Sequence, residues 1–306
     1  MHYVVTGGAG FIGSNITKKL VSYGHDVSVI DNLNTGKLEN LESVKNRIKF
    51  YKMDIRSFDE INGIIRDADG IFHQAALTVV QDSYTKTEEY IDVNVTGTEN
   101  IFRSAKVNNL KVVFASSSSV YGDVQDIPIS EEFEKNPINP YGKTKLDDEF
   151  LAEKFWNDGV HIIGLRYFNV YGKGQNKAYA GVITKFLDRI NKKENLEIFG
   201  TGKQVRDFIF VEDVARANIS AMTSKVKNGF FNVGTGEKIS IEELGKMMIK
   251  ISKSTLDLKY ITPLEGDVNL SQADKELSKR LLGWESKKKL QSWLKDIFEM
   301  DIEHGK

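Results

Sequence analysis

The chain has 306 residues, with 42 Lys and Arg against 43 Asp and Glu, a net charge of −1 and no cysteine. The absence of cysteine excludes disulfides, a thiolate nucleophile and a cysteine-based zinc site. The even charge balance argues against a nucleic acid or a membrane surface as partner, because both select a basic excess.

The first residues enter an apolar run directly, without the basic region and cleavage site of a signal peptide. No apolar stretch approaches the ~18 residues that are needed to span a bilayer. We therefore expect a cytoplasmic protein. The length fits two domains, or one large α/β domain with a smaller partner.

Short apolar runs alternate with helical stretches over the first 170 residues or so. Strands separated by helices predict right-handed crossovers and a parallel sheet. The fold class expected is therefore α/β, a doubly wound parallel Rossmann sheet with a smaller, interleaved α/β substrate-binding domain. We expect strands at residues 2–6, 26–30, 48–53, 70–73, 111–116 and 161–167, and helices at 11–23, 58–66, 84–107 and 141–157.

The regular alternation of strands and helices ends near residue 170, where longer irregular segments rich in Gly, Asn and Lys begin. Two later strands, at residues 207–210 and 230–233, and a helix at 211–224 still have the pattern of core elements. We therefore expect residues 1–169 to form the Rossmann domain, with 207–233 returning to it. Residues 170–306 would mainly form the substrate domain.

Residues 6–13, Thr-Gly-Gly-Ala-Gly-Phe-Ile-Gly, follow the first expected strand and open the first expected helix, as a pyrophosphate-binding turn requires. Gly7 and Gly10 let the backbone approach the phosphates, and Gly13 permits close packing of helix and strand. Asp31, at the end of the second strand, would accept hydrogen bonds from the adenosine ribose and repel a 2′-phosphate. NAD is therefore favoured over NADP, and a plain glycine turn is the alternative.

Residues 139–145, Asn-Pro-Tyr-Gly-Lys-Thr-Lys, indicate the start of a helix with Asn139 as its N-cap. Tyr141 and Lys145 then lie on one face, four residues apart. A phenol, whose reference pKa is ~10, is a poor base at neutral pH, and a nearby ammonium group and nicotinamide cation would stabilise the phenolate. Chance alone gives roughly one such spacing in this composition, so the pair needs its context.

That context is a run of four serines at residues 116–119, directly after an apolar strand. Hydroxyls there would lie at the carboxyl edge of the sheet, where open α/β folds bind ligands. A polar strand exit, with serines satisfying local backbone groups, is the alternative. Beside the glycine loop and the Tyr141–Lys145 pair, the functional interpretation is favoured.

Together these motifs resemble the extended short-chain dehydrogenase/reductase family, and specifically its NAD-dependent nucleotide-sugar epimerase branch, typified by UDP-glucose 4-epimerase. The resemblance covers essentially the whole chain. The other matching segments are residues 31–33, 54–55, 73–76, 94–98, 166–172, 206–208, 266–267 and 273–274.

The resemblance implies that Tyr141 is the catalytic base, Lys145 its electrostatic partner and ribose ligand, and Ser117 the hydroxyl on the sugar O4. Tyr141 would take the O4 proton while C4 gives a hydride to NAD; the 4-keto sugar would then rotate and receive the hydride on its other face. The residues implied in holding a tight, recycled NAD are Gly7, Gly10, Phe11, Ile12, Gly13, Asp31, Asn32, Asp54, Ile55, Gln74, Ala75, Ala76, Asn94, Ser116, Tyr141, Lys145 and Phe168.

The substrate implied is a UDP-sugar. Asn169 and Arg206 would hold its diphosphate. The full set implied in substrate binding is Ser117, Asn169, Ala180, Val182, Phe186, Arg206, Asp267 and Ser271. A metal site is not expected, and the resemblance implies a homodimer through the helices near residues 84–107 and 141–157.

Several positions separate related activities. Ser118 and Ser119 stand where related dehydratases carry Asp-Glu, so epimerisation is favoured over dehydration. Leu264 replaces an arginine that commonly binds the diphosphate. Thr78 and Val79 also depart from common residues, and Ser271, being small, favours admission of N-acetylhexosamines as well as glucose and galactose. The alternatives are a UDP-glucuronate 4-epimerase, a net NAD-dependent oxidoreductase on nucleotide sugars, and a non-catalytic NAD-binding protein.

Overall fold

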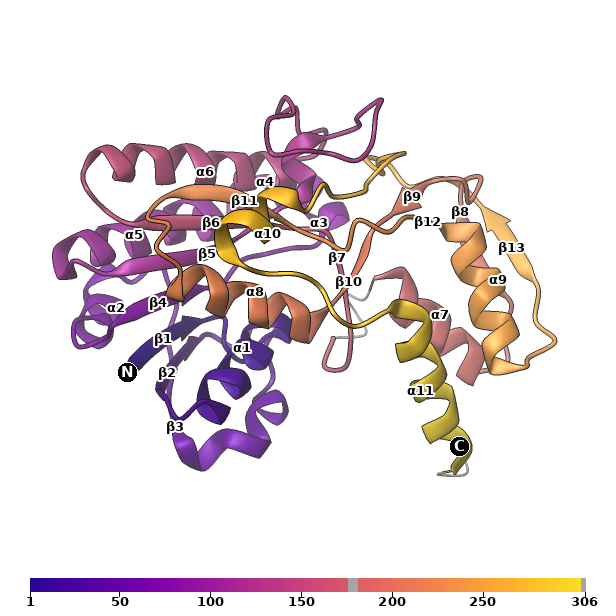
Figure 1. Ribbon diagram of the computed structural model, residues 1–306, viewed down its shortest axis with the longest axis horizontal. Helices are drawn as coiled ribbons and strands as arrows, with labels where there is room; N and C mark the ends of the chain where they lie inside the picture. Colours follow the sequence, from indigo (N-terminus) through magenta and orange to yellow (C-terminus); the bar gives the residue numbers. More distant parts are fainter. Residues whose placement is uncertain (176–180, 304–306) are drawn as a thin grey trace.

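The computed structural model describes residues 1–175 and 181–303, and within them a seven-stranded parallel sheet forms the centre of the larger lobe (Figure 1). The strand order is β11-β6-β5-β4-β1-β2-β3. The order reverses between β1 and β4, and ligands bind above the carboxyl ends of strands at such a switch point. The strands are β1 (His2–Thr6), β2 (Asp26–Asp31), β3 (Ile48–Lys52), β4 (Gly70–His73), β5 (Lys111–Ser117), β6 (Ile162–Tyr167) and β11 (Gly229–Val233).

Helices cover both faces of this sheet, as the alternating sequence pattern predicts. α1 (Phe11–Ser22) and α8 (Val211–Thr223) pack on one face, and α2 (Phe58–Ile65), α5 (Gly97–Asn108) and α6 (Pro140–Asn157) on the other. Successive strand residues point to opposite faces, so Val5 joins the first of these cores and Val4 the second. Burial on both sides explains why the strands are apolar throughout.

The smaller lobe has a core of its own, built from α7 (Val182–Asn191), α9 (Ile241–Ser252) and α11 (Leu290–Glu303). Its strands pair two by two: β7 (Asn169–Tyr171) with β10 (Phe208–Phe210), β8 (Leu196–Phe199) with β13 (Leu258–Ile261), and β9 (Val205–Arg206) with β12 (Ile239–Ser240). α10 (Glu276–Leu282) packs back against β11 of the larger lobe. The chain therefore passes between the lobes more than once.

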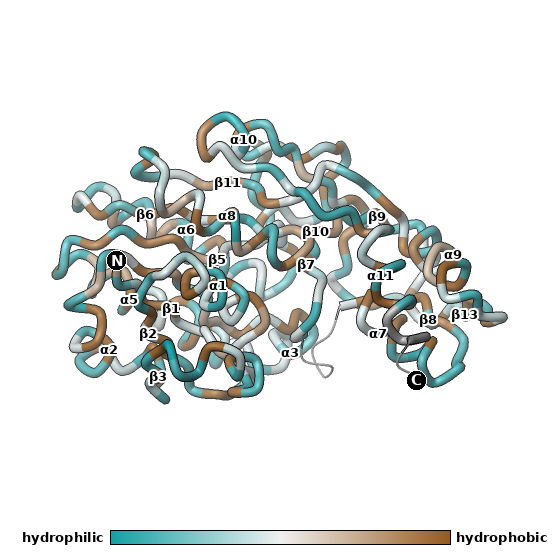
Figure 2. Tube along the Cα trace, turned by 60° about the horizontal axis from the view of Figure 1, so that its bottom comes forward, coloured by the Kyte–Doolittle hydropathy of each residue, from teal (hydrophilic) through white to brown (hydrophobic). Residues whose placement is uncertain are grey.

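The segment after residue 206 shows how the lobes interleave. β10 extends β7 in a small pair, whereas β11 joins the large sheet beside β6, and α8 between them packs on α1. Peripheral turns are largely hydrophilic in Figure 2. None of the described helices combines the length and the apolar character that a membrane crossing needs.

The prediction of a single helix over residues 84–107 is wrong. The structure breaks it into α3 (Val80–Thr85), α4 (Thr87–Tyr90), a π-helical segment η2 (Ile91–Thr96) and α5. The buried Asn94 side chain explains the π-helical turn, since it accepts from the N–H of Leu77 at 2.7 Å and donates to its carbonyl at 3.0 Å. A 3₁₀ segment, η1 (Leu38–Arg47), after β2 and another, η3 (Ser118–Tyr121), after β5 were also not predicted.

Candidate active site

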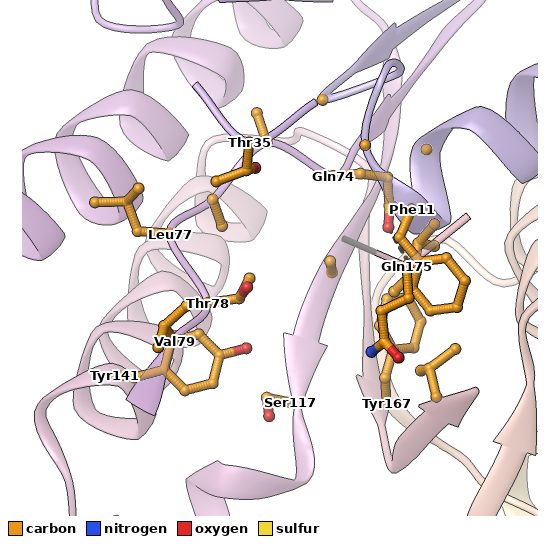
Figure 3. Close-up of a pocket in the computed structure, with 18 of the residues that line it drawn as sticks. Phe11, Thr35, Gln74, Leu77, Thr78, Val79, Ser117, Tyr141, Tyr167 and Gln175 are labelled. Carbon is orange, nitrogen blue, oxygen red and sulfur yellow. Dashed lines mark hydrogen bonds between the residues drawn. The ribbon is translucent and has the colours of Figure 1, made fainter. Parts of the chain in front are cut away.

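A cavity of about 1220 Å³ opens above the carboxyl ends of the central strands. Its wall runs from the glycine loop, past Ser117 and Tyr141, to Val182 and Asp267 of the smaller lobe. Figure 3 shows the middle of this cavity, with the Tyr141 ring on one side and Ser117 on the strand opposite. This volume exceeds the ~300–1,000 Å³ of ordinary ligand pockets, so the cavity has room for more than one ligand.

The glycine loop has the close packing that its sequence predicts. Gly7 has a φ of +64°, and a Cβ on Gly13 would lie only 2.2 Å from the carbonyl oxygen of Gly7. α1 begins directly after Gly10, and its first turn, which the structure describes in full, carries no acidic side chain. The N–H groups of that turn therefore remain available to an anion, as a pyrophosphate requires.

The adenosine end of the cavity holds the predicted carboxylates. Asp31 is almost fully buried, and its two oxygens accept from the backbone N–H groups of Ala9 at 2.9 Å and Leu33 at 2.8 Å. Burial raises the pKa of Asp31, and these N–H donors oppose the rise. Each oxygen keeps a lone pair for a ribose hydroxyl, so the residue fits NAD.

Asp54 is more constrained than the sequence suggests. Its carboxylate accepts from the Arg56 guanidinium at 2.9 Å through both oxygens and from the Asn32 amide at 3.0 Å. The hydrogen bonds from Arg56 hold the pKa of Asp54 well below its usual range. Arg56 also reaches Asp92 at 2.6 Å, which ties the end of β3 to η2 beside the adenosine end.

Ser117 and Tyr141 approach the cavity from different elements. Ser117 is the last residue of β5, and its hydroxyl donates to Ser119 Oγ at 3.1 Å and accepts from the Ser119 N–H at 3.1 Å. Tyr141 stands in the first turn of α6, where the Asn139 side chain accepts from the Gly142 N–H at 2.8 Å, so the predicted N-cap is confirmed. The two hydroxyl groups face the same space (Figure 3).

Lys145 lies one turn further along α6 and also lines the cavity. Its ammonium group is 3.0 Å from the carboxylate of Asp148, and both side chains are buried. The sequence analysis did not single out Asp148. Its spacing of three residues from Lys145 is the signal that was available for it.

A second buried ion pair holds α6 to the sheet. The Glu149 carboxylate accepts from Arg166 at 2.9 and 2.7 Å and from the Ser116 hydroxyl at 2.6 Å. These contacts join α6 to β6 and β5 directly behind Ser117. The Ser116 hydroxyl therefore has a structural role, because it donates its hydrogen to Glu149.

The far end of the cavity belongs to the smaller lobe. Arg206, at the end of β9, pairs with the Asp267 carboxylate, and Asp267, Asn169 and Leu264 line the wall. Leu264 is 37% exposed where the resemblance leads one to expect an arginine. Lys185 of α7 also lines this end, so it supplies positive charge that the sequence analysis missed.

The structure brings most of the predicted site residues to this cavity, but not all. Phe186 is a correction: it lies in the core of the smaller lobe, because α7 turns it toward α9 and Gly245. Asn94 and Arg206 do not line the cavity but contact the lining residues Leu77 and Asp267, Ser271 is buried and does not line it, and Ala180 lies outside the described residues. The predicted residues that line the wall are Gly7, Gly10, Phe11, Ile12, Gly13, Asp31, Asn32, Asp54, Ile55, Gln74, Ala75, Ala76, Ser116, Ser117, Tyr141, Lys145, Phe168, Asn169, Val182 and Asp267.

Comparisons with known proteins agree with this geometry. A profile of the NAD dependent epimerase/dehydratase family matches residues 3–234. A putative UDP-glucose 4-epimerase of Methanocaldococcus jannaschii is 38% identical over 309 residues, covering 96% of this chain and 98% of that protein.

Two solved structures are similar over nearly the whole length. The UDP-glucose 4-epimerase of Thermotoga maritima with UDP-glucose gives a TM-score of 0.94 at 34% identity, covering 100% of both chains. The UDP-N-acetylglucosamine 4-epimerase of Methanobrevibacter ruminantium, in complex with UDP-N-acetylmuramic acid, gives 0.93 at 34% identity, covering 99% of this chain and 98% of that one.

Proposed function

Because the chain belongs to the NAD-dependent epimerase/dehydratase family, we propose that it is an NAD-dependent UDP-hexose 4-epimerase. The observation that carries the proposal is the meeting of Ser117, Tyr141 and Lys145 in one cavity. That cavity continues from the glycine loop to Asp267, so one end fits NAD and the other a nucleotide sugar.

The chemistry that NAD supplies when bound is reversible hydride transfer at C4 of the sugar. The glycine loop and the first turn of α1 would hold its pyrophosphate, and Asp31 its adenosine ribose. Lys145 would bind the nicotinamide ribose and keep positive charge next to Tyr141.

The side chains of the chain itself handle the proton. Ser117 would donate a hydrogen bond to the sugar O4, while the Tyr141 phenolate accepts the O4 proton as the C4–H bond breaks. The same phenol returns the proton to O4 when C4 is reduced from its other face. The proton and the hydride are therefore both restored, and the net reaction is an isomerisation.

Epimerisation fits the site better than dehydration does. A dehydratase needs a further acid–base pair to move protons at C5 and C6. Ser118 and Ser119 occupy the positions after Ser117, and the Ser119 hydroxyl is hydrogen-bonded to Ser117 at 3.1 Å. Neither serine is an acid or a base at neutral pH, which supports an epimerase.

The substrates that we propose are UDP-glucose and UDP-galactose, and also UDP-N-acetylglucosamine and UDP-N-acetylgalactosamine. Two relatives with the same fold are named for glucose and for N-acetylglucosamine epimerisation. Thr78 and Val79, which lie beside Tyr141 in the cavity (Figure 3), have uncharged side chains.

We also propose a homodimer through α5 and α6. Large apolar side chains stay exposed there, with Val107 68% and Phe150 57% exposed. Single exposed apolar residues are ordinary, but a pair on two neighbouring helices supports a covered face. A cytoplasmic location and a role in galactose metabolism stay predictions from the sequence.

The proposal is tested by NMR of the purified protein with UDP-glucose, UDP-N-acetylglucosamine and UDP-glucuronate separately, without added NAD. We expect the 4-epimers of the first two sugars, no net absorbance change at 340 nm, and a loss of ~10²–10⁴-fold in rate for Tyr141→Phe. A stoichiometric change at 340 nm that needs added NAD would instead indicate a net oxidoreductase. If no sugar is converted, or Tyr141→Phe matches the unaltered enzyme, the proposed function is wrong.

A further inference from the structure

The catalytic lysine has a buried negative partner on its own helix. Lys145 Nζ lies 3.0 Å from Asp148 Oδ2, with the lysine side chain 3% exposed and the aspartate 0% exposed. Asp148 Oδ1 has no hydrogen-bond partner among the described residues. A fully enclosed carboxylate with one unsatisfied oxygen is costly, so its charge depends on Lys145.

A row of polar side chains connects this pair to the glycine loop. The hydroxyl of Thr6, the residue before Gly7, lies 2.7 Å from His73 Nδ1. The other ring nitrogen, His73 Nε2, lies 2.9 Å from the Thr98 hydroxyl. The Thr98 hydroxyl in turn favours the charged form of Asp148. Thr98 therefore connects His73 to the surroundings of Asp148.

Among the described residues, three other titratable groups that interact with Tyr141 or Lys145, namely His73, Tyr90 and Tyr167, are neutral at neutral pH, and the Glu89 side chain lines the same cavity. On β4, burial and the charge of Lys145 lower the pKa of His73 to about 3. On α4 and β6, burial raises the pKa of Tyr90 and of Tyr167 well above 10. On α6 itself, Glu149 is turned away to Arg166.

We propose that Asp148 is a positioning residue that fixes Lys145 and partly offsets its positive charge at Tyr141, thereby setting the pH range in which Tyr141 acts as the base. This inference rests on the proposed function for the role of Tyr141. It assigns Asp148 no contact with substrate or cofactor, since Asp148 does not line the cavity.

The offset has a limited pH range. Burial raises the pKa of Asp148 to about 6, although the charge of Lys145 opposes the rise. Above that pH the carboxylate is ionised and weakens the attraction of Lys145 for a phenolate. Below it, Asp148 is protonated and the full lysine charge acts on Tyr141.

Asp148→Asn keeps the shape of the side chain and removes its charge at every pH. Lys145 lines the cavity, so a ribose bound there can accept a hydrogen bond from its ammonium group in place of the lost carboxylate. We therefore expect Tyr141 to ionise at a pH lower by about 1 unit in the variant. Below pH 6 the variant and the unaltered enzyme should converge.

The test is an absorbance titration at 295 nm, in which the spectrum of the matching Tyr141→Phe protein is subtracted to isolate the Tyr141 phenolate. It uses the NAD-loaded enzyme as purified, and the pH profile of epimerisation is recorded beside it. We expect the titration midpoint and the acid limb of the rate profile to move together to lower pH. A purely structural role would lower the rate at all pH values and leave both in place.

Asp147→Asn is the matched control, because it removes the same charge from the adjacent position, where Asp147 is partly exposed and faces Lys143. We expect it to move the midpoint by less than ~0.3 unit, since solvent screens it. If Asp148→Asn does not fold, Thr98→Val replaces it and should give a smaller shift in the same direction. An unchanged midpoint, or a shift to higher pH, would overturn the inference.

The absorbance titration requires no turnover, so the two proposals fail separately. A protein that shifts as expected but converts no UDP-sugar refutes the proposed function alone. An active epimerase whose Tyr141 midpoint ignores Asp148 refutes this inference alone.

Discussion

The buried pair of Glu149 and Arg166 gives a direct measure of how firmly α6 is anchored to the sheet. Glu149→Gln keeps the size of the side chain but replaces one carboxylate oxygen by an amide that faces the donors of Arg166. The guanidinium is 2% exposed and would keep the Tyr121 hydroxyl at 2.8 Å and the Glu131 carbonyl at 3.1 Å as acceptors. Neither acceptor carries a charge, so the arginine loses the only carboxylate to which the described residues show it hydrogen-bonded.

Breaking a buried pair by removing one partner costs ~3–5 kcal/mol, because the remaining charge stays out of water. Glu149 accepts a bidentate bond from Arg166 and a further bond from Ser116, so we expect a value inside that range. At ~2.1 cal/mol/K per residue, a chain of 306 residues loses about 0.6 kcal/mol of stability per degree near its midpoint. The expected fall in Tm is therefore roughly 5–8 °C.

The assay is differential scanning calorimetry at one scan rate, with Glu153→Gln as the control. Glu153 is exposed on the same helix, one turn later, and a surface change of this kind is worth less than ~0.5 kcal/mol. If Glu149→Gln melts within 1 °C of Glu153→Gln, a margin of about 0.6 kcal/mol, the pair contributes nothing net and the reasoning is refuted.

Three further changes test other parts of the structure. Gly13→Ala should reduce the amount of NAD released from the denatured protein by more than ~10-fold, because the added Cβ would lie 2.2 Å from the Gly7 carbonyl oxygen. In the control Gly63→Ala, the added Cβ meets nothing within 4 Å, so the bound NAD should be retained. Burial holds the pKa of His73 near 3 in the folded protein, whereas a histidine in the unfolded chain has a pKa of ~6.5, so between these values only the unfolded chain binds the proton. Between pH 6.5 and 4 the free energy of urea unfolding should therefore fall faster with decreasing pH than in His73→Gln, by up to ~1.4 kcal/mol per pH unit. Parallel slopes for the two proteins would contradict this. Leu264→Arg adds a guanidinium to the cavity wall and should tighten calorimetric UDP binding by about 10-fold, and an unchanged Kd would show that Leu264 does not face the diphosphate.

The sequence predicts the parts of the molecule in which chemistry and local structure coincide. The glycine loop, Asp31 and the Tyr141–Lys145 pair each combine a local turn or helix start with a functional group, so their place in the fold follows from short-range pattern. The strand positions follow in the same way, because burial on both faces demands continuous apolar runs.

What the sequence does not predict depends on distant partners. Glu149 and Arg166 are 17 residues apart and meet only because α6 packs across β6. Phe186 looks equally suited to a pocket and to a core, and the position of α9 decides between them. In the sequence, Asp148 has the pattern of a surface residue on an amphipathic helix. It is buried only because α6 packs with that side toward His73 and Thr98.

The late position of β11 in the chain bears on how the protein is made. All six residues of β6 are buried, and its second neighbour, β11, lies more than 60 residues downstream. While residues 170–228 are still being synthesised, β6 is an unpaired apolar edge, and such edges invite pairing with other chains. The sheet of the larger lobe therefore cannot be completed until β11 has been synthesised, at a point where α9 and α11 of the smaller lobe are still to follow.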